Sequence, residues 1–195
     1  MARPREFNEE IALQGAMDVF WMHGYEGASL PELLEGMEIT RGSLYKAFTD
    51  KKTLFISVLK RYEQDAVQPA INLLTNDEIK DGKLRIEKLF MSILEAVEND
   101  DHKGCLLCSA AAGPAHKDEQ IAKNVHQLLG KMKSAFELAL KQSKTHQNLD
   151  DEKRSHLADL LITQYIGLRI LSRSQASVVT IKRSIASLMV LLTAK

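Results

Sequence analysis

The stretch "ITRGSLYKAFTDKK", residues 39–52, decides how the first quarter of the chain folds. It concentrates positive charge: against one acid, Asp50, stand Arg41, Lys46, Lys51 and Lys52. Thr40 and Asp50 are residue types that cap helices, so the stretch predicts a two-turn helix over 41–47 and a longer one from 51. The whole chain is neutral, with 26 basic and 26 acidic residues. Because salt screens exposed charges beyond ~8 to 10 Å, the local excess of cations is what a nearby anion would meet.

The residues before this stretch predict a second, shorter helix. Ser29 and Glu32 have the spacing of a capping box, in which each side chain binds the other residue's backbone amide. Gly36 should end that helix, while a longer helix with an apolar stripe covers about 6–23. The order is therefore long helix, short helix, tight turn, short helix, long helix. Two short helices joined by such a turn form a helix-turn-helix.

A helix-turn-helix places the start of its second helix in the DNA major groove. Arg41 could read a guanine edge or grip a phosphate, and Gly42 lets the backbone approach closely. Leu44 and Phe48 should pack inward. The start of the next helix favours phosphate, and Lys51 and Lys52 strengthen that preference. We therefore expect DNA contacts from Thr40, Arg41, Gly42, Ser43, Tyr45, Lys46, Lys51, Lys52 and Ser29, with Arg3 and Arg5 as a basic arm.

The rest of the chain also reads as helix. Hydrophobic residues make up 45% and only four prolines occur, and no long stretch alternates apolar and polar residues. The fold class expected is all-α, with further helices near 84–98, 105–113, 120–142, 151–172 and 177–193. The domains expected are a helix-turn-helix domain over 1–50 and a larger helical domain over 51–195. No apolar run would span a bilayer or serve as a signal peptide, which favours a cytoplasmic protein.

The sequence from Ile11 to Phe55 resembles the DNA-binding domain of the TetR family of transcriptional regulators. The matching run is "ALQGAMDVFWMHGYEGASLPELLEGMEITRGSLYKAFTDKKTLF". The family pattern "GV[ST]xGxxYxxFxxKxxL" is met by Ile39, Thr40, Gly42, Tyr45, Phe48, Lys51 or Lys52, and Leu54. One departure is Gly36-Met37-Glu38, which replaces the Ala-Gly turn usual before that pattern.

The resemblance implies a homodimeric regulator, usually a repressor of a double-stranded DNA operator. Its larger helical domain would bind a small-molecule effector and hold the dimer interface. A two-fold dimer must place its recognition helices about 34–36 Å apart to reach successive major grooves. An effector that prefers another separation would release the operator by its differential affinity for the two states.

Two sets of apolar residues bear on these expectations. The last two helices carry more aliphatic side chains than one side of a small domain needs, so we expect two copies to form a four-helix bundle, with Gly167 allowing close approach. An apolar ligand pocket would be lined by residues of four helices. These residues are Phe90, Met91, Leu94, Met132, Phe136, Gln164, Tyr165 and Leu168, each of which could equally be plain core.

Cys105 and Cys108 are the two cysteines of the chain and have a CxxC spacing. Reduced, packed thiols are the simplest interpretation. A redox- or electrophile-sensing regulator that uses them is an alternative, because a thiolate is favoured at a helix start. His102 and His116 flank the pair, so a zinc-type metal site is a weaker alternative, and we expect no metal or other cofactor.

Other function classes find less support in the sequence. It contains no Gly-rich phosphate loop, no HExxH and no nucleophile elbow, so we expect no enzyme. A helical adaptor that does not bind DNA remains an alternative. Salt dependence separates a DNA-binding regulator from such an adaptor, because the affinity of a regulator for a duplex falls steeply as the salt concentration rises.

Overall fold

The computed structural model describes residues 7–193, and Arg3 and Arg5 lie outside this range. Within it every regular element is helical and no strand occurs, which confirms the all-α prediction. No helix in residues 7–193 is both long enough and apolar enough to cross a bilayer. The chain forms two compact units. Within the described range, unit 1 contains residues 7–65 together with Ser109–His126, and unit 2 contains Ala66–Cys108 and residues 127–193.

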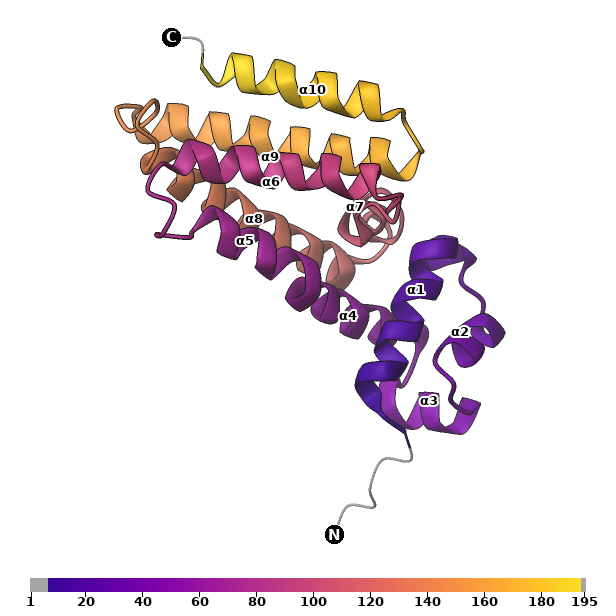
Figure 1. Ribbon diagram of the computed structural model, residues 1–195. Helices are drawn as coiled ribbons and strands as arrows, with labels where there is room; N and C mark the ends of the chain where they lie inside the picture. Colours follow the sequence, from indigo (N-terminus) through magenta and orange to yellow (C-terminus); the bar gives the residue numbers. More distant parts are fainter. Residues whose placement is uncertain (1–6, 194–195) are drawn as a thin grey trace. The chain divides into compact units, whose positions relative to one another are not determined.

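Unit 1 opens with the four helices that the sequence predicts: α1 (Glu9–Gly27), α2 (Leu30–Gly36), α3 (Arg41–Phe48) and α4 (Lys51–Tyr62). Helix α1 packs against both α2 and α4, as Figure 1 shows. Gly24 interrupts α1 with φ 70° and ψ 174°, and one further turn follows it. The helix expected to end near residue 23 therefore continues through a kink at Gly24, because glycine tolerates a positive φ without a steric penalty.

Side chains cap each of these helices at its first turn. Ser29 and Glu32 form the capping box, with the Ser29 amide donating to Glu32 Oε2 at 2.8 Å. Thr40 Oγ1 accepts from the Ser43 amide at 3.2 Å, and Asp50 Oδ1 accepts from the Thr53 amide at 2.7 Å. The cap positions expected from the sequence are confirmed, since local hydrogen bonding alone fixes them.

The core of unit 1 brings aromatic rings and glycines together. The Phe20 and Phe55 rings meet edge to face with centroids 4.8 Å apart. Gly15 of α1 lies so close to α2 that a Cβ atom there would come within 1.8 Å of the Gly36 carbonyl oxygen. Leu44 and Phe48 are buried against this core, as expected.

The turns on either side of α3 use positive φ at residues that are not glycine. Glu38, in the segment that departs from the usual Ala-Gly turn, has φ 54°. Thr49 has φ 62° and ψ −54°, and the Asp50 amide donates to the Phe48 carbonyl across it at 2.6 Å. Such a tight three-residue turn is rare and strained, particularly at a β-branched residue. It places the end of α3 directly before the start of α4.

Unit 2 contains α5 (Gln68–Leu74), α6 (Gly82–Glu98), α9 (Asp151–Arg173), α10 (Val178–Leu191) and most of α8 (Glu119–Lys141). A π-helical turn, Glu63–Val67, precedes α5, and a short helix, α7 (Leu106–Ala112), leads to the 3-10 turn Pro114–His116. Helix α6 packs against α5, α9 and α10 (Figure 1). The later helices start and end within a few residues of the expected positions, because their apolar stripes are long and regular.

A buried arginine fixes one end of unit 2. Arg85 is 2% exposed, and its Nε donates to the Ile79 carbonyl at 2.6 Å. Its Nη1 donates to the Leu74 carbonyl and to Gln142 Oε1. A guanidinium is tolerated in a core when its donors are satisfied in this way. The side chain thereby ties the end of α5 to the residue that follows α8.

Candidate nucleic-acid interface

Helix α3 has one exposed face and one buried face. Leu44 and Phe48 are almost fully buried, whereas Arg41, Gly42, Tyr45 and Lys46 are exposed. The apolar pair holds the helix against unit 1, and the polar face is left for another molecule. This is the arrangement that a recognition helix requires.

The first turn of α3 is ordered by its own side chains. Thr40 Oγ1 lies 3.0 Å from Ser43 Oγ, in addition to accepting from the Ser43 amide. The Arg41 guanidinium lies over the Tyr45 ring, 5.7 Å from its centroid. A cation held over an aromatic face in this way has fewer rotamers to lose on binding.

The two lysines at the start of α4 are held differently. The Lys51 ammonium lies 5.0 Å from the centre of the Tyr25 ring and donates to the Glu26 carbonyl at 3.5 Å. Burial lowers the pKa of Lys51. Lys52 Nζ lies 3.2 Å from Oδ2 of Asp118. These contacts compensate the cost of placing positive charge at the positive end of a helix dipole.

The structure brings most of the predicted DNA contacts into unit 1. Thr40, Arg41, Gly42, Ser43, Tyr45 and Lys46 share α3 and its cap, and Asp50 leads directly from α3 to Lys51 and Lys52. Ser29 is exposed, but its hydroxyl is engaged in the capping box. Sequence reasoning missed Tyr25 and Asp118, which contact the two lysines. No local pattern pairs Asp118 with Lys52, because 66 positions separate them.

The predicted pocket residues do not share one environment. Phe90, Leu94, Met132, Phe136 and Leu168 are buried in unit 2. The Phe90 ring lies 6.3 Å from Phe136 and 6.2 Å from Tyr165, centroid to centroid. Burial raises the pKa of Tyr165 to about 12. Met91 and Gln164 are exposed instead, so the eight side chains do not line one enclosed space.

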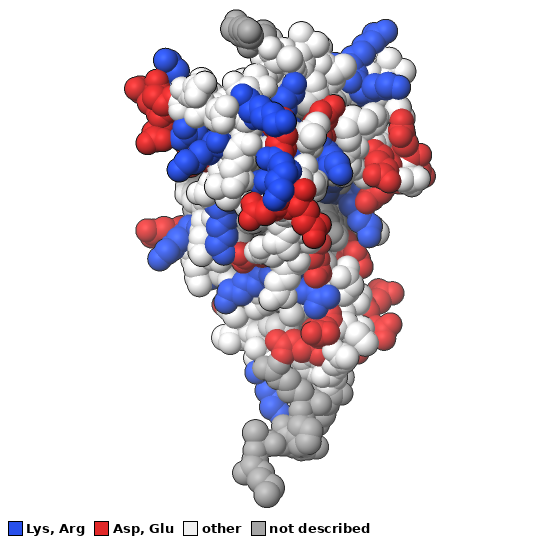
Figure 2. Space-filling model, turned by 60° about the vertical axis from the view of Figure 1, so that its left-hand side comes forward, with Lys and Arg blue, Asp and Glu red and all other residues white. Residues whose placement is uncertain are grey.

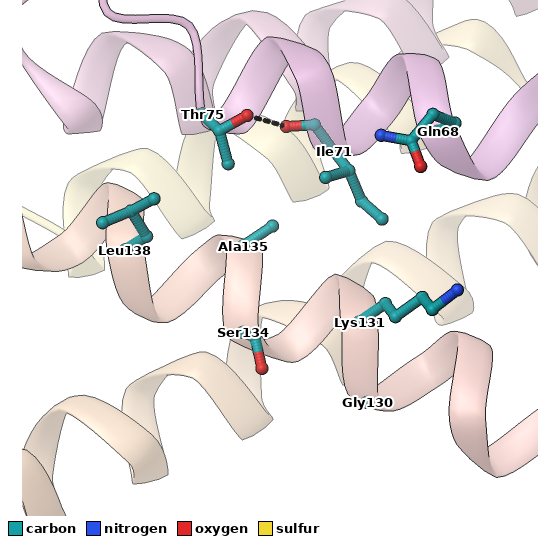
Figure 3. Close-up of a pocket in the computed structure, with 8 residues that line it drawn as sticks. All are labelled: Gln68, Ile71, Thr75, Gly130, Lys131, Ser134, Ala135 and Leu138. Atoms are coloured by element: carbon teal, nitrogen blue, oxygen red, sulfur yellow. Dashed lines mark hydrogen bonds between the residues drawn. The ribbon is translucent and has the colours of Figure 1, made fainter.

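A groove that the sequence did not predict lies between α5 and α8. It measures about 580 Å³ and is lined by Gln68, Ile71, Thr75, Gly130, Lys131, Ser134, Ala135 and Leu138. Figure 3 shows Ile71 and Ala135 facing one another across it, with Gln68 and Lys131 at one end. The Thr75 hydroxyl donates to the Ile71 carbonyl at 2.9 Å. Gly130, a glycine in mid-helix, was the signal available in the sequence, because it leaves space where other residues would place a side chain.

Both cysteines are buried in unit 2. Cys108 shares a side-chain hydrogen bond with Cys105, and this bond, together with burial, raises the pKa of the Cys108 thiol far above its ordinary value. A protonated thiol is a poor nucleophile. The preceding residues are fixed to α9, where Arg169 donates to the Gly104 carbonyl and His102 Nδ1 lies 3.0 Å from the Ser172 carbonyl oxygen.

The structure does not assemble the metal site considered as an alternative. In the part of the chain from 7 to 193, no three side chains of histidine, cysteine, aspartate or glutamate come together to hold a metal ion. His102 is turned toward Asp100 and Ser172, and His116 Nδ1 contacts the Gly113 carbonyl oxygen at 2.5 Å.

Basic and acidic side chains are intermingled over the face shown in Figure 2, in keeping with zero net charge.

Comparison with known proteins matches the helix-turn-helix segment first. The family model described as "Bacterial regulatory proteins, tetR family" matches residues 12–58, which span α1 to most of α4. The uncharacterized HTH-type transcriptional regulator YezE of Bacillus subtilis (strain 168) is 27% identical over 180 residues, covering 90% of this chain and 91% of the relative. The HTH-type transcriptional repressor ComR of Escherichia coli (strain K12) is 27% identical over 182 residues, covering 90% and 84%.

A solved structure extends the match to almost the whole fold. A cysteine mutant of the TetR family transcriptional regulator CifR, complexed with 26-bp double-strand operator DNA, has a TM-score of 0.80 to this chain. It is 29% identical, and the alignment covers 95% of this chain and 99% of that one. The likeness therefore includes unit 2 as well as the helix-turn-helix.

Proposed function

Because this chain belongs to the TetR family of bacterial transcriptional regulators, we propose that it represses transcription as a homodimer on a double-stranded DNA operator. A small-molecule effector bound to unit 2 releases the operator. The observation that carries this proposal is the two-faced α3, whose Leu44 and Phe48 are buried while Arg41, Tyr45 and Lys46 are exposed. The protein acts in the cytoplasm and catalyses no reaction.

Recognition of the operator divides between base edges and phosphates. Arg41 and Gly42, at the start of α3, reach the major-groove edges, where arginine pairs well with guanine. Ser43, Tyr45 and Lys46 bind phosphate oxygens and position the helix. The start of α4, with Lys51 and Lys52, binds a phosphate through backbone amides and charge.

Dimerisation uses the exposed aliphatic side chains of α9 and α10. Leu160, Ile170, Val190 and Leu191 are between 43% and 68% exposed in the single chain. Exposed apolar side chains gathered on two adjacent helices are typical of a protein interface. A two-fold axis through these helices would pair the same surface of both copies and form a four-helix bundle.

The effector binds unit 2 and acts through a difference in affinity between two states. The groove between α5 and α8 is open to a ligand as it stands. A ligand among Phe90, Leu94, Met132, Phe136, Tyr165 and Leu168 would have to displace packed rings. Met91 and Gln164 would take part only if α6 and α9 also moved.

The test is selection of duplexes from a random-sequence DNA library, followed by binding measurements over a salt series. A regulator should retain a specific duplex, and its log affinity should fall linearly with log salt by about 0.9 per phosphate contacted. A helical adaptor would retain no duplex. A screen of small molecules by thermal shift then identifies effectors, since a bound ligand raises the unfolding temperature.

A further inference from the structure

Lys52 forms an ion pair with a carboxylate of its own chain. Its ammonium lies 3.2 Å from Oδ2 of Asp118, and the two side chains are 39% and 27% exposed. Both residues belong to unit 1. In the proposed function, Lys52 is one of the two lysines that bind a phosphate at the start of α4. The Lys52 ammonium can therefore pair either with the Asp118 carboxylate or with an operator phosphate.

Asp118 uses its two oxygens for two tasks. Oδ1 accepts from the amides of Gln120 and Ile121, at 3.0 and 3.1 Å, and so caps α8. Oδ2 faces Lys52. The hydrogen bonds from these backbone amides and the contact with Lys52 lower the pKa of Asp118, so its carboxylate is charged at neutral pH. Because asparagine caps helices as well as aspartate does, the charge can be removed without removing the cap.

Of the two lysines at the start of α4, Lys52 forms an ion pair with a carboxylate of the described part of the chain, whereas Lys51 does not. Lys51 is held by the Tyr25 ring and the Glu26 carbonyl, neither of which is a full negative charge. The Glu26 and Glu32 carboxylates act on the Lys51 charge at longer range. Within residues 7–193 their ion pairs are with Lys117 and His23, and neither pairs with Lys51. At Lys52 a phosphate meets the Asp118 carboxylate, which repels phosphate and attracts the same ammonium.

We propose that Asp118 sets the affinity for DNA by competing with an operator phosphate for Lys52. The inference rests on the proposed function, because it takes Lys52 as a phosphate contact. The pair is partly exposed and screened, so the competition is modest. Asp118→Asn should tighten operator binding about two- to five-fold at low salt and steepen the salt dependence by up to about 0.9.

The experiment is a double-mutant cycle on a duplex selected from a random library, measured by fluorescence anisotropy over a salt series. Asp118→Asn should tighten binding in the wild-type background and leave it unchanged in the Lys52→Ala background. Asp159→Asn is the matched control, because it also removes one negative charge from an ion pair, with Lys133 at 2.7 Å, but in unit 2. It should not tighten binding. Thermal unfolding of Asp118→Asn should match the wild type.

The outcomes separate the inference from the proposed function. Weaker or unchanged binding by Asp118→Asn overturns the competition, as does equal tightening in the Lys52→Ala background or in Asp159→Asn. If the wild type binds its duplex and Lys52→Ala binds equally well, Lys52 is no phosphate contact and the inference fails while the proposed function stands. If no duplex is retained by any variant, the proposed function fails, and the inference fails with it.

Discussion

The guanidinium carbon of Arg41 lies 5.7 Å from the centre of the Tyr45 ring, one helical turn further along α3. Both side chains are exposed, and neither is needed to bury the core of unit 1. This contact is already made in the protein without DNA, and it orders the part of α3 that would enter the groove. An ordered arginine loses less conformational entropy when it binds a base edge.

The first prediction concerns this arginine. Arg41→Ala should weaken binding to the selected duplex by about 1–3 kcal/mol, or roughly 5- to 150-fold, and relax specificity at one base pair. Lys52→Ala should weaken binding more evenly across sequences, and both variants should remain dimeric. Lys60→Ala, an exposed lysine at the far end of α4, is the control. Unchanged binding in both test variants would contradict the assigned contacts.

The second prediction concerns the contact between α1 and α2. Gly15→Ala should destabilise the protein by about 1–3 kcal/mol or more, because the new Cβ atom would meet the Gly36 carbonyl at 1.8 Å. Gly130→Ala is the matched control, since no atom lies within 4 Å of its Cβ position. It should stabilise α8 by about 0.5–1 kcal/mol. Urea denaturation measures both, and equal effects would show that the helices do not approach this closely.

The third prediction concerns dimerisation. Leu191→Glu places a charge on an aliphatic side chain that is 67% exposed in the single chain. If α9 and α10 form the interface, this variant should dissociate into folded monomers, because a buried unpaired carboxylate is costly. Leu84→Glu, on α6 and 49% exposed, should stay dimeric. Analytical ultracentrifugation distinguishes these results, and a dimeric Leu191→Glu protein would place the interface elsewhere.

The fourth prediction concerns the thiols. Because hydrogen bonding to Cys105 and burial raise the pKa of Cys108, that thiol should react with Ellman's reagent far more slowly in the native protein than in urea. Cys105→Ser should leave the response to a non-electrophilic effector unaltered. Rapid native labelling, or operator release by an electrophile that Cys105→Ser abolishes, would instead favour a thiol sensor.

The fifth prediction concerns pH. Burial lowers the pKa of His146 below its ordinary 6.5; a hydrogen bond with the Leu192 backbone opposes this effect, the Lys83 charge adds to it, and the Asp81 charge opposes it. The folded protein therefore binds this proton less readily than the unfolded chain. This histidine's contribution to the free energy of unfolding is full above about pH 6.5 and is lost as pH falls below that value. Urea denaturation between about pH 7.5 and 5.5 should show this loss.

The control for this prediction is a pair of histidine variants. His146→Asn keeps a polar atom near Ser143 Oγ, which lies 2.9 Å from the histidine Nδ1. It should reduce the dependence of stability on pH. His126→Asn replaces an exposed histidine and should preserve it. An identical pH slope in both variants would exclude His146 as the titrating group.

The sequence by itself determined the helices of unit 1 and the exposed face of α3. Capping by Ser29, Thr40 and Asp50 depends on residues only three positions apart, so local chemistry specifies it. The inward orientation of Leu44 and Phe48 follows from helical periodicity in the same way. The family resemblance depends on this local pattern too.

Only the tertiary structure decided which side chains contact the two lysines of α4 and where unit 2 has a groove. The Lys52–Asp118 pair and the groove between α5 and α8 join residues more than 50 positions apart. Periodicity assigned Gln164 to a pocket, yet the structure leaves it exposed, because a stripe shows which residues share a face but not which helix covers that face. Long-range packing settles that choice, and no window of sequence contains it.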